Sequence, residues 1–293
     1  MITMTDLGGY GRLGNQLFQY AMLKSVSHKL NLELKIPNPK ISHWHGQNCL
    51  LDNFTLSCSF LENQDFNRIK HSFSELNTCA FDSRVFEVEA NTNFFGIYLN
   101  KNYFIDIPEV IKKDLNFIPQ VYDYAKNYIL NLKKLVGEGT EIVSVHMRRG
   151  DNTDGTNSNL AHYYGLNNSF GEDSVFGSYF TKAKDFFKNK KVVYLIFTGG
   201  SRLGDINSED VNWCKNNIKG ELYFYSENNS SIQDFAIMSM CDHNIIGHET
   251  TFSWWAAYLN KNKNKIVVAP EKWFFGHEDR NVLDFHPSEF NQI

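Results

Sequence analysis

Apolar and polar positions divide this chain into an irregular N-terminal part and a regular C-terminal part. A short apolar stretch at Ile2–Leu7 runs into a glycine cluster, helical spacing follows, and Asn31–Ile36 then alternates as a strand does. This order predicts a strand, a loop, a helix and a second strand. Residues 38–99 show scattered aromatic and polar positions without a clear period, and no element is predicted there.

From residue 142 onward, the patterns of strands and helices alternate regularly. Runs rich in β-branched residues suit strands that are buried on both faces of a sheet. The predicted strands are Ile142–Met147, Val192–Phe197, Glu221–Tyr225, Asn244–Gly247 and Lys265–Ala269. The predicted helices are Phe176–Phe187, Asp210–Asn217, Ile232–Cys241 and Thr251–Asn260. This alternation predicts a parallel α/β sheet, and ligands of such sheets bind beyond the carboxyl ends of the strands.

Chain length and one polar run together predict two domains. A chain of 293 residues exceeds the usual length of one domain, which is about 100 to 200 residues. Helices are expected to begin near Pro108 and Pro119, because proline suits the first turn of a helix. The polar run Lys133–Glu141 is the candidate linker, so we expect domains at residues 1–136 and 137–293. Whether the last segment packs back on the first domain is left open.

Composition and charge exclude several classes of protein. Lysine and arginine number 29 against 33 acidic residues, and the formal charge of -4 gives no global field that attracts nucleic acid or anionic lipid. The five cysteines form no C-x-x-C pair, which is typical of reduced thiols in a cytosolic protein. The sequence shows no signal peptide and no apolar stretch long enough for a membrane span. We therefore expect a cytoplasmic protein.

The segment His146-Met-Arg-Arg-Gly-Asp151 ends the first predicted strand of the regular part. This is where a parallel sheet binds its ligand. Two adjacent guanidinium groups repel each other unless an anion compensates, and the planar guanidinium matches phosphate oxygens. A diphosphate is therefore the natural partner. The alternative is structural, with one arginine paired to Asp151 to hold the turn and the other solvated.

A second candidate site is Gly247–Trp255, which joins a predicted strand to the helix after it. The hydroxyls of Thr250, Thr251 and Ser253 can cap free helix N–H groups, and the same positive helix end can hold phosphate. Capping alone is the alternative. Asp234, near the start of the preceding predicted helix, is an acceptor that suits the N1–H and exocyclic amine of guanine. Its alternative role is that of a charge partner for the helix N-terminus.

The N-terminal loop carries the pattern G-x-G-x-x-G at Gly9, Gly11 and Gly14, which suggests a dinucleotide-binding fold. The acidic residue expected at the end of the second strand is missing, because Ile36-Pro37 stands there. An NAD(P)-dependent oxidoreductase is therefore the second choice of function. A non-catalytic glycan-binding protein that uses the pair Trp254-Trp255 is the third.

Three motifs occur in order along the chain. They are Gly11-Arg-Leu-Gly-Asn-Gln-Leu-Phe-Gln-Tyr20, Val145-His-Met-Arg-Arg-Gly-Asp151 and Thr251-Phe-Ser-Trp-Trp-Ala-Ala-Tyr-Leu259. Together they resemble the alpha-1,2-fucosyltransferase family, glycosyltransferase family 11, which is related to the protein O-fucosyltransferases. The resemblance implies an α/β, GT-B-like fold, with two Rossmann-type domains facing a cleft. Residues 1–136 would serve the acceptor, and residues 137–293 would hold GDP-fucose.

The resemblance also implies roles for individual residues, with Arg148 at the diphosphate and Asn15 at the reacting centre. The implied catalytic residues are Arg148, Asn15 and Asp151. The implied nucleotide-binding residues are His146, Arg149, Asp234, Thr250, Thr251, Phe252 and Ser253.

The implied reaction is an inverting transfer of L-fucose from GDP-fucose to a sugar hydroxyl, with the 2-hydroxyl of a galactoside as first choice. The sequence contains no Asp-x-Asp pair, so we expect no metal and no other cofactor, and cationic groups neutralise the leaving GDP. Asp151 is the first choice of general base, with Asp154, Glu249 and a base-free route through Asn15 as alternatives. Family members often carry other residues at Glu249-Thr250, so the acceptor and the linkage stay open.

Overall fold

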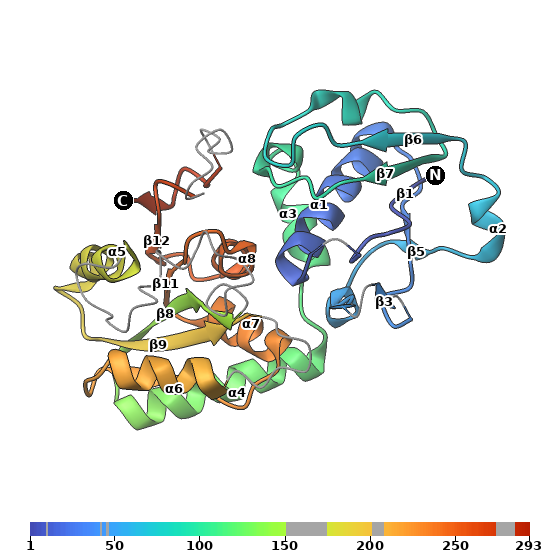
Figure 1. Cartoon of the computed structure of the whole chain (residues 1–293). Helices are drawn as coiled ribbons and strands as arrows, with labels where there is room; N and C mark the ends of the chain where they lie inside the picture. The colour runs from blue at the N-terminus through green and yellow to red at the C-terminus, as the bar shows by residue number, and fades with distance from the viewer. Residues whose placement is uncertain (10, 42, 45–46, 151–174, 201–207, 274–284) are drawn as a thin grey trace. The chain divides into compact units, whose positions relative to one another are not determined.

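The computed structural model describes the chain except for residues 10, 42, 45–46, 151–174, 201–207 and 274–284 (Figure 1). The chain divides into two compact units. Unit 1 comprises Met1–Ile118 and Val282–Phe285, and unit 2 comprises Pro119–Asn281 and His286–Ile293.

The boundary between the units follows Ile118, one helix before the boundary expected near residue 136. This helix, α4 (Pro119–Val136), packs on α7 (Ser231–Met240), which belongs to unit 2. From the last segment, Phe285 packs on Phe18 within unit 1, with ring centroids 6.2 Å apart.

Unit 1 is built on short parallel strands. They are β1 (Ile2–Thr3), β2 (Lys35–Ile36), β5 (Ser59–Phe60), β6 (His71–Ser74) and β7 (Thr92–Phe95). β7 lies between β1 and β6, while β2 pairs with β5. A parallel bridge between Ile2 and Leu34 places the β2–β5 pair on the other side of β1. The order is therefore β5-β2-β1-β7-β6, and every one of these pairings is parallel.

Helices and a hairpin complete unit 1. The helical elements are α1 (Leu13–Leu30), η1 (Leu51–Asn53), α2 (Asn63–Phe66), η2 (Ser83–Phe86), η3 (Lys101–Tyr103) and α3 (Pro108–Asp114). The hairpin pairs β3 (His43–Trp44) with β4 (Gln47–Asn48). α1 follows the glycine loop, as predicted, and ends at Asn31, whose left-handed backbone (φ 52°) is a common helix ending.

Unit 2 is built on a larger parallel sheet. Its strands are β8 (Glu141–Arg148), β9 (Val192–Gly199), β10 (Tyr223–Tyr225), β11 (His243–Ile245), β12 (Val267–Ala269) and β13 (Asn291–Gln292). Their order is β10-β9-β8-β11-β12-β13, and all pairings are parallel. The prediction of a C-terminal parallel sheet is confirmed. The chain moves outward through β8, β9 and β10, then returns to the other side of β8 with β11.

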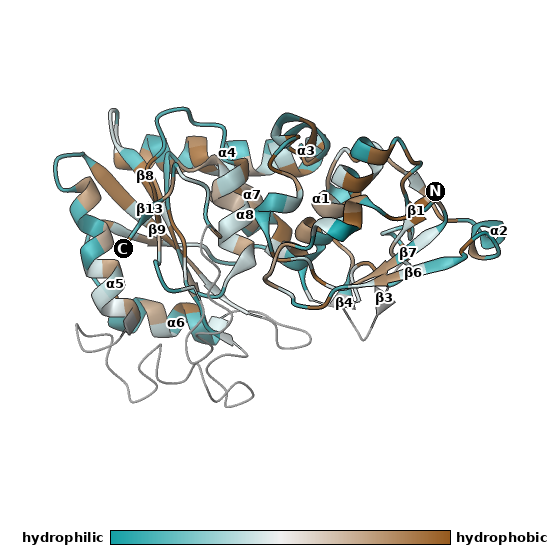
Figure 2. Ribbon diagram, turned by 90° about the horizontal axis from the view of Figure 1, so that it is seen from above, coloured by the Kyte–Doolittle hydropathy of each residue, from teal (hydrophilic) through white to brown (hydrophobic). Residues whose placement is uncertain are grey.

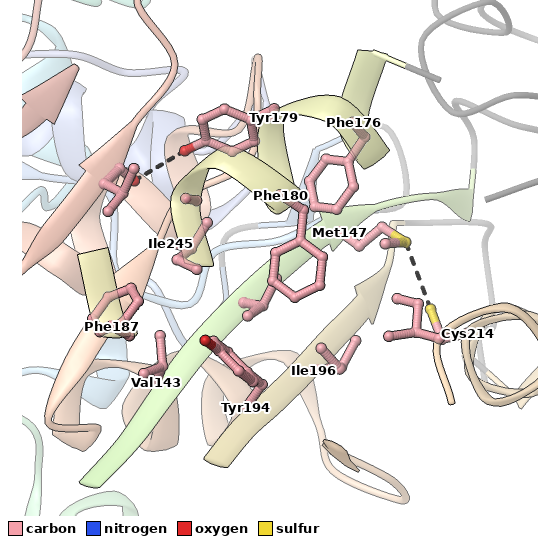
Figure 3. Close-up of a cluster of buried hydrophobic side chains, with 14 of the residues drawn as sticks. Val143, Met147, Phe176, Tyr179, Phe180, Phe187, Tyr194, Ile196, Cys214 and Ile245 are labelled. Atoms are coloured by element: carbon pink, nitrogen blue, oxygen red, sulfur yellow. Dashed lines mark hydrogen bonds between the residues drawn. The ribbon is translucent and has the colours of Figure 1, made fainter. Parts of the chain in front are cut away.

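Helices cover both faces of this sheet. They are α4, α5 (Val175–Lys184), α6 (Ser208–Asn217), α7 and α8 (Thr251–Leu259), with the short η6 (Asp185–Phe187) after α5. On one face, Phe180 of α5 and Cys214 of α6 pack with Val143 and Tyr194 of the central strands (Figure 3). α7 contacts both α4 and α8 on the other side. β8 and β9 are largely brown in Figure 2, as strands buried on both faces must be.

Two further expectations concern the cysteines and the membrane. All five cysteines are free, which confirms the prediction of reduced thiols. In the core, the Sγ atom of Cys214 lies 3.7 Å from the Sδ atom of Met147 (Figure 3). None of the helices in the described part of the chain combines the length and apolar character that a membrane span needs.

Candidate active site

The predicted nucleotide-binding residues of unit 2 gather at the carboxyl edge of its sheet. The strand order reverses between β8 and β11, because β9 and β10 extend one side of β8 and β11 begins the other. Two connections diverge at such a point and leave a crevice where α/β sheets bind ligands. His146 and Arg148 end β8, and Thr250 to Ser253 open α8 directly after β11. The sequence therefore places both candidate motifs at the same crevice.

His146 is the buried centre of this group. Its Nδ1 lies 3.0 Å from the hydroxyl Oγ1 of Thr250, and its ring packs against Phe252 with centroids 5.5 Å apart. Burial, together with the nearby charge of Arg148, lowers the pKa of His146 to about 3. The imidazole is therefore neutral at physiological pH, with one nitrogen that donates a hydrogen bond and one that accepts.

The backbone between β11 and α8 passes very close to β8. A Cβ at Gly247 would lie 2.6 Å from the carbonyl oxygen of His146, so glycine is required for this approach. The hydroxyl of Ser253 accepts a hydrogen bond from the Gly247 N–H at 3.3 Å. These contacts fix the first turn of α8 beside the end of β8. The free N–H groups of that turn carry the partial positive charge that favours an anion.

The two adjacent arginines lie in different surroundings. Arg148 is half-buried, and because side chains alternate along a strand it shares the face of β8 that carries His146. Arg149 is buried. Its Nε donates to Oδ1 of Asp210 at 3.1 Å, and its guanidinium stacks 3.7 Å from the ring centroid of Trp213. In the structural alternative, one of the two arginines holds the turn by pairing with Asp151. Arg149 has such a structural role, but its partner is Asp210. Nucleotide binding by Arg149 stays a prediction.

The turn after the arginines is closed by a second glycine contact. Gly150 has a left-handed backbone (φ 60°), and a Cβ there would collide with the backbone of Gly200. The Arg149 N–H also donates to the Gly199 carbonyl at 3.1 Å. The ends of β8 and β9 are therefore held together, which fixes the direction in which Arg148 leaves its strand.

Asp234 lies in the first turn of α7, behind a Ser230–Gln233 capping box. It is buried, and one carboxylate oxygen accepts a hydrogen bond of 2.6 Å from the Ser226 hydroxyl. Burial raises the pKa of Asp234 to about 6, although the hydrogen bonds from Ser226 and Asn229 oppose the shift. The neighbouring Phe235 packs on Phe252, at 5.2 Å between centroids, and so links α7 to the first turn of α8.

Two predicted catalytic residues are not joined to this group. Asn15 lies in the first turn of α1, in unit 1, and the structure does not place the two units relative to each other. Asp151 lies outside the described residues. The partners Asp210 and Ser226 were missed by sequence reasoning. No local sequence pattern indicates that Trp213 would stack on Arg149.

The tryptophan pair does not form a sugar-binding platform. Trp254 and Trp255 both have 0% exposed surface, and their rings pack edge to face at 5.2 Å. The proposed lectin surface at this pair is therefore wrong. In the described part of the chain, no three His, Cys, Asp or Glu side chains gather as metal ligands would.

Comparison with solved structures defines the class of the fold. NodZ alpha-1,6-fucosyltransferase soaked with GDP-fucose aligns with a TM-score of 0.51 at 14% identity, covering 88% of this chain and 91% of NodZ. POFUT1 in complex with GDP aligns with a TM-score of 0.52 at 13% identity, covering 94% and 98%. At such identities the likeness shows the fold, and the GT-B-like α/β class expected from the sequence is confirmed.

Comparison of sequences then gives the family. The model of glycosyl transferase family 11 matches residues 1–280, so this chain belongs to that family of enzymes. The alpha-1,2-colitosyltransferase of Escherichia coli is 28% identical, over 97% of this chain and 96% of the relative. The O-antigen biosynthesis glycosyltransferase WbnK of Escherichia coli is 25% identical, over 91% and 94%. Galactoside alpha-(1,2)-fucosyltransferase 2 of Rattus norvegicus is 25% identical, over 87% and 67%.

Proposed function

We propose that this glycosyltransferase moves L-fucose from GDP-fucose to the 2-hydroxyl of a galactoside, with inversion at the sugar and without a metal ion. The observation that carries the proposal is the meeting of His146, Arg148 and the first turn of α8 at the reversal point of the unit 2 sheet. A guanidinium and a helix N-terminus at one crevice suit a diphosphate. Membership in family 11 makes a sugar nucleotide the natural source of that diphosphate.

The nucleotide contacts follow from the same geometry. Arg148 faces the diphosphate, and the amides and hydroxyls of Thr250 to Ser253 hold its oxygens. Ionised Asp234 accepts hydrogen bonds from the N1–H and amino group of guanine. Arg149 supports this set by fixing the turn at the end of β8 through Asp210.

The chemical step is a displacement at C1 of fucose. The acceptor oxygen forms a bond to C1 while the bond from C1 to the β-phosphate oxygen breaks, and GDP leaves with that electron pair. Arg148 and the α8 N–H groups stabilise the negative charge that grows on the phosphates. The acceptor proton passes to a base, for which Asp151 stays the first choice, or to water in a base-free route through Asn15.

Two donor sugars, fucose and colitose, are compatible with the relatives of this chain. One relative is named for colitose and another for fucose. The two sugars differ at C3, where colitose lacks the hydroxyl. An assay with both sugar nucleotides separates these two donors. A cytoplasmic location, predicted from the cysteines, belongs to the same proposal.

A direct assay tests the proposal. Purified protein is incubated with GDP-fucose, GDP-colitose, GDP-mannose or NAD(H), together with lactose or N-acetyllactosamine, with and without EDTA. We expect GDP release with GDP-fucose that EDTA does not reduce, and an alpha-1,2 linkage by NMR of the product. Turnover only with GDP-colitose would correct the donor. Oxidation of NADH, or loss of activity with EDTA, would contradict the proposal.

A further inference from the structure

The connection from β10 to α7 carries polar side chains that lead to Asp234. Ser226 follows the last residue of β10 and continues the sheet, because its N–H donates to the Ile196 carbonyl at 2.9 Å. Asn228 has a left-handed backbone (φ 58°), which asparagine adopts more readily than most residues, and the chain turns there toward α7. After this turn, Nδ2 of Asn229 lies 2.7 Å from the hydroxyl oxygen of Ser226.

The hydrogen bonds of this group all run toward Asp234. An ionised carboxylate accepts only, so the Ser226 hydroxyl donates its one proton to Oδ1 of Asp234 at 2.6 Å. The Ser226 oxygen can then only accept, and it accepts from the Asn229 amide. The amide oxygen of Asn229 in turn accepts from the hydroxyl of Tyr124, which lies on α4. The charge of Asp234 therefore sets the direction of the whole chain of hydrogen bonds.

This chain of donors opposes the effect of burial on Asp234. The residue is 7% exposed, and burial raises the pKa of its carboxyl to about 6. Hydrogen bonds from Ser226 and Asn229 act against that shift. Donors to an ionised acceptor are strong, and in a medium of low dielectric constant the members of a chain polarise one another. The donors thus favour the ionised state of Asp234, which is the state that can accept from guanine.

The other groups around Asp234 come from three elements. From α4, Tyr128 faces the same connection, and burial raises the pKa of its hydroxyl, so it stays neutral near physiological pH. On the connection itself, Glu227 forms an ion pair with Lys215. From α8, the apolar ring of Phe252 packs on the residue that follows Asp234. Near neutral pH, burial and the chain of donors therefore govern the charge of this carboxyl.

We propose that Asn229 and Ser226 are positioning residues for guanine recognition, because they aim the Asp234 carboxylate and keep it ionised. Tyr124 extends the chain to α4 and fixes which end of the Asn229 amide faces Ser226. This inference rests on the proposed function, in which guanine is the base that Asp234 reads. Tyr124, Ser226 and Asn229 lie outside the three motifs that carry the family resemblance.

Carbon-13 NMR measures the effect on Asp234 directly, without any nucleotide. The full-length protein is labelled at the carboxyl carbon of aspartate, and Asp234→Asn assigns the signal. Ser226→Ala should raise the pKa of Asp234 by roughly one pH unit, because the ionised form loses a hydrogen bond. Asn229→Leu should raise this pKa less and Tyr124→Phe least, since each acts one step further from the carboxylate.

Two matched variants separate this role from general effects of substitution. Tyr122→Phe removes the hydroxyl of another exposed tyrosine of α4 and should leave the pKa of Asp234 unchanged. Ser230→Ala removes the N-cap of α7, so it should lower the melting temperature and still leave this pKa unchanged. Equal shifts in Tyr122→Phe and Tyr124→Phe, or a pKa that does not move in Ser226→Ala, would overturn the chain.

Calorimetry with GDP then tests the role in recognition. Protonated Asp234 cannot accept from guanine, so the pH at which GDP binding weakens should move upward with the pKa. At pH 6 the Kd of Ser226→Ala for GDP should be about fivefold above that of the wild type by linkage. IDP, which lacks the amino group of guanine, should lose less affinity.

The two measurements together distinguish this inference from the proposed function. A pKa that shifts in Ser226→Ala without any change in GDP affinity would overturn the positioning role. A wild-type protein that does not bind GDP would contradict the proposed function and, with it, the guanine role. The NMR titration would still establish whether the chain acts on Asp234.

Discussion

Both units are built on parallel sheets, but the strands of the two sheets differ in length and in burial. In unit 2, β8 and β9 are buried almost throughout, and three side chains of the candidate site are held by neighbours, with His146 on Thr250, Arg149 on Asp210 and Asp234 on Ser226. In unit 1, β1 and β2 have two residues each, and β6 at the sheet edge is mostly exposed.

The difference explains why the diphosphate is expected at unit 2, where the groups of the candidate site are held in place. A departing diphosphate develops charge during the reaction, and groups that are already oriented stabilise it without rearranging. Substitutions at these groups should therefore change rate, stability and affinity to different degrees.

Arg148→Ala should have the largest effect on rate. Loss of one preorganised donor to the developing charge typically costs ~100- to 1000-fold in kcat. The melting temperature should not change, because Arg148 is half-buried at the end of its strand. Steady-state kinetics with GDP-fucose, alongside thermal melting, check both statements. Near-normal turnover would remove Arg148 from the site.

Arg149→Ala should act mainly on stability. It leaves Asp210 buried without its cation, and breaking a buried ion pair costs about 3 kcal/mol or more in the free energy of unfolding. Urea denaturation measures this loss. Trp213→Leu, which removes only the stacking, should cost about 1 kcal/mol. An Arg149→Ala protein of normal stability that no longer binds GDP would show instead that Arg149 holds the nucleotide.

GDP affinity should depend on the ionisation of Asp234. Burial raises its pKa to about 6, and only the ionised carboxylate accepts from guanine, so protonation weakens binding as the pH falls. Between pH 7 and pH 5 the Kd for GDP should rise about tenfold by linkage. His146, with a pKa of about 3, stays neutral throughout this range. Calorimetry on Asp234→Asn should show weak binding with little pH dependence.

Thr250→Val should have the smallest effect. It removes the hydroxyl 3.0 Å from Nδ1 of His146 but keeps the shape of the side chain. A hydrogen bond of this kind contributes about 1 kcal/mol, which is roughly a fivefold loss in kcat/KM for GDP-fucose. Thr250→Ser restores the hydroxyl and should recover most of the activity. Equal losses in both variants would show that the methyl group, not the hydrogen bond, matters.

The sequence predicted unit 2 much better than unit 1. The predicted strand Val192–Phe197 is β9 (Val192–Gly199), and the predicted helix Thr251–Asn260 is α8 (Thr251–Leu259). Strands buried on both faces need continuous apolar runs, and such runs are visible in a sequence. β6 (His71–Ser74) is a short, mostly exposed edge strand with polar residues, so residues 38–99 gave no signal.

The candidate site was predicted in its motifs but not in its pairings. Motif position identified His146, near the end of one strand, and Thr250, which follows another strand, and the structure brings them together. The partnership of Arg149 with Asp210 spans 61 positions and depends on how α6 packs, which no local pattern encodes.

A crystal structure of the protein with GDP-fucose tests the central claim most directly. The account predicts the diphosphate within hydrogen-bond distance of Arg148 and of the first turn of α8, with guanine against Asp234. Nucleotide bound at the glycine loop of unit 1, or anywhere away from Arg148, would contradict it.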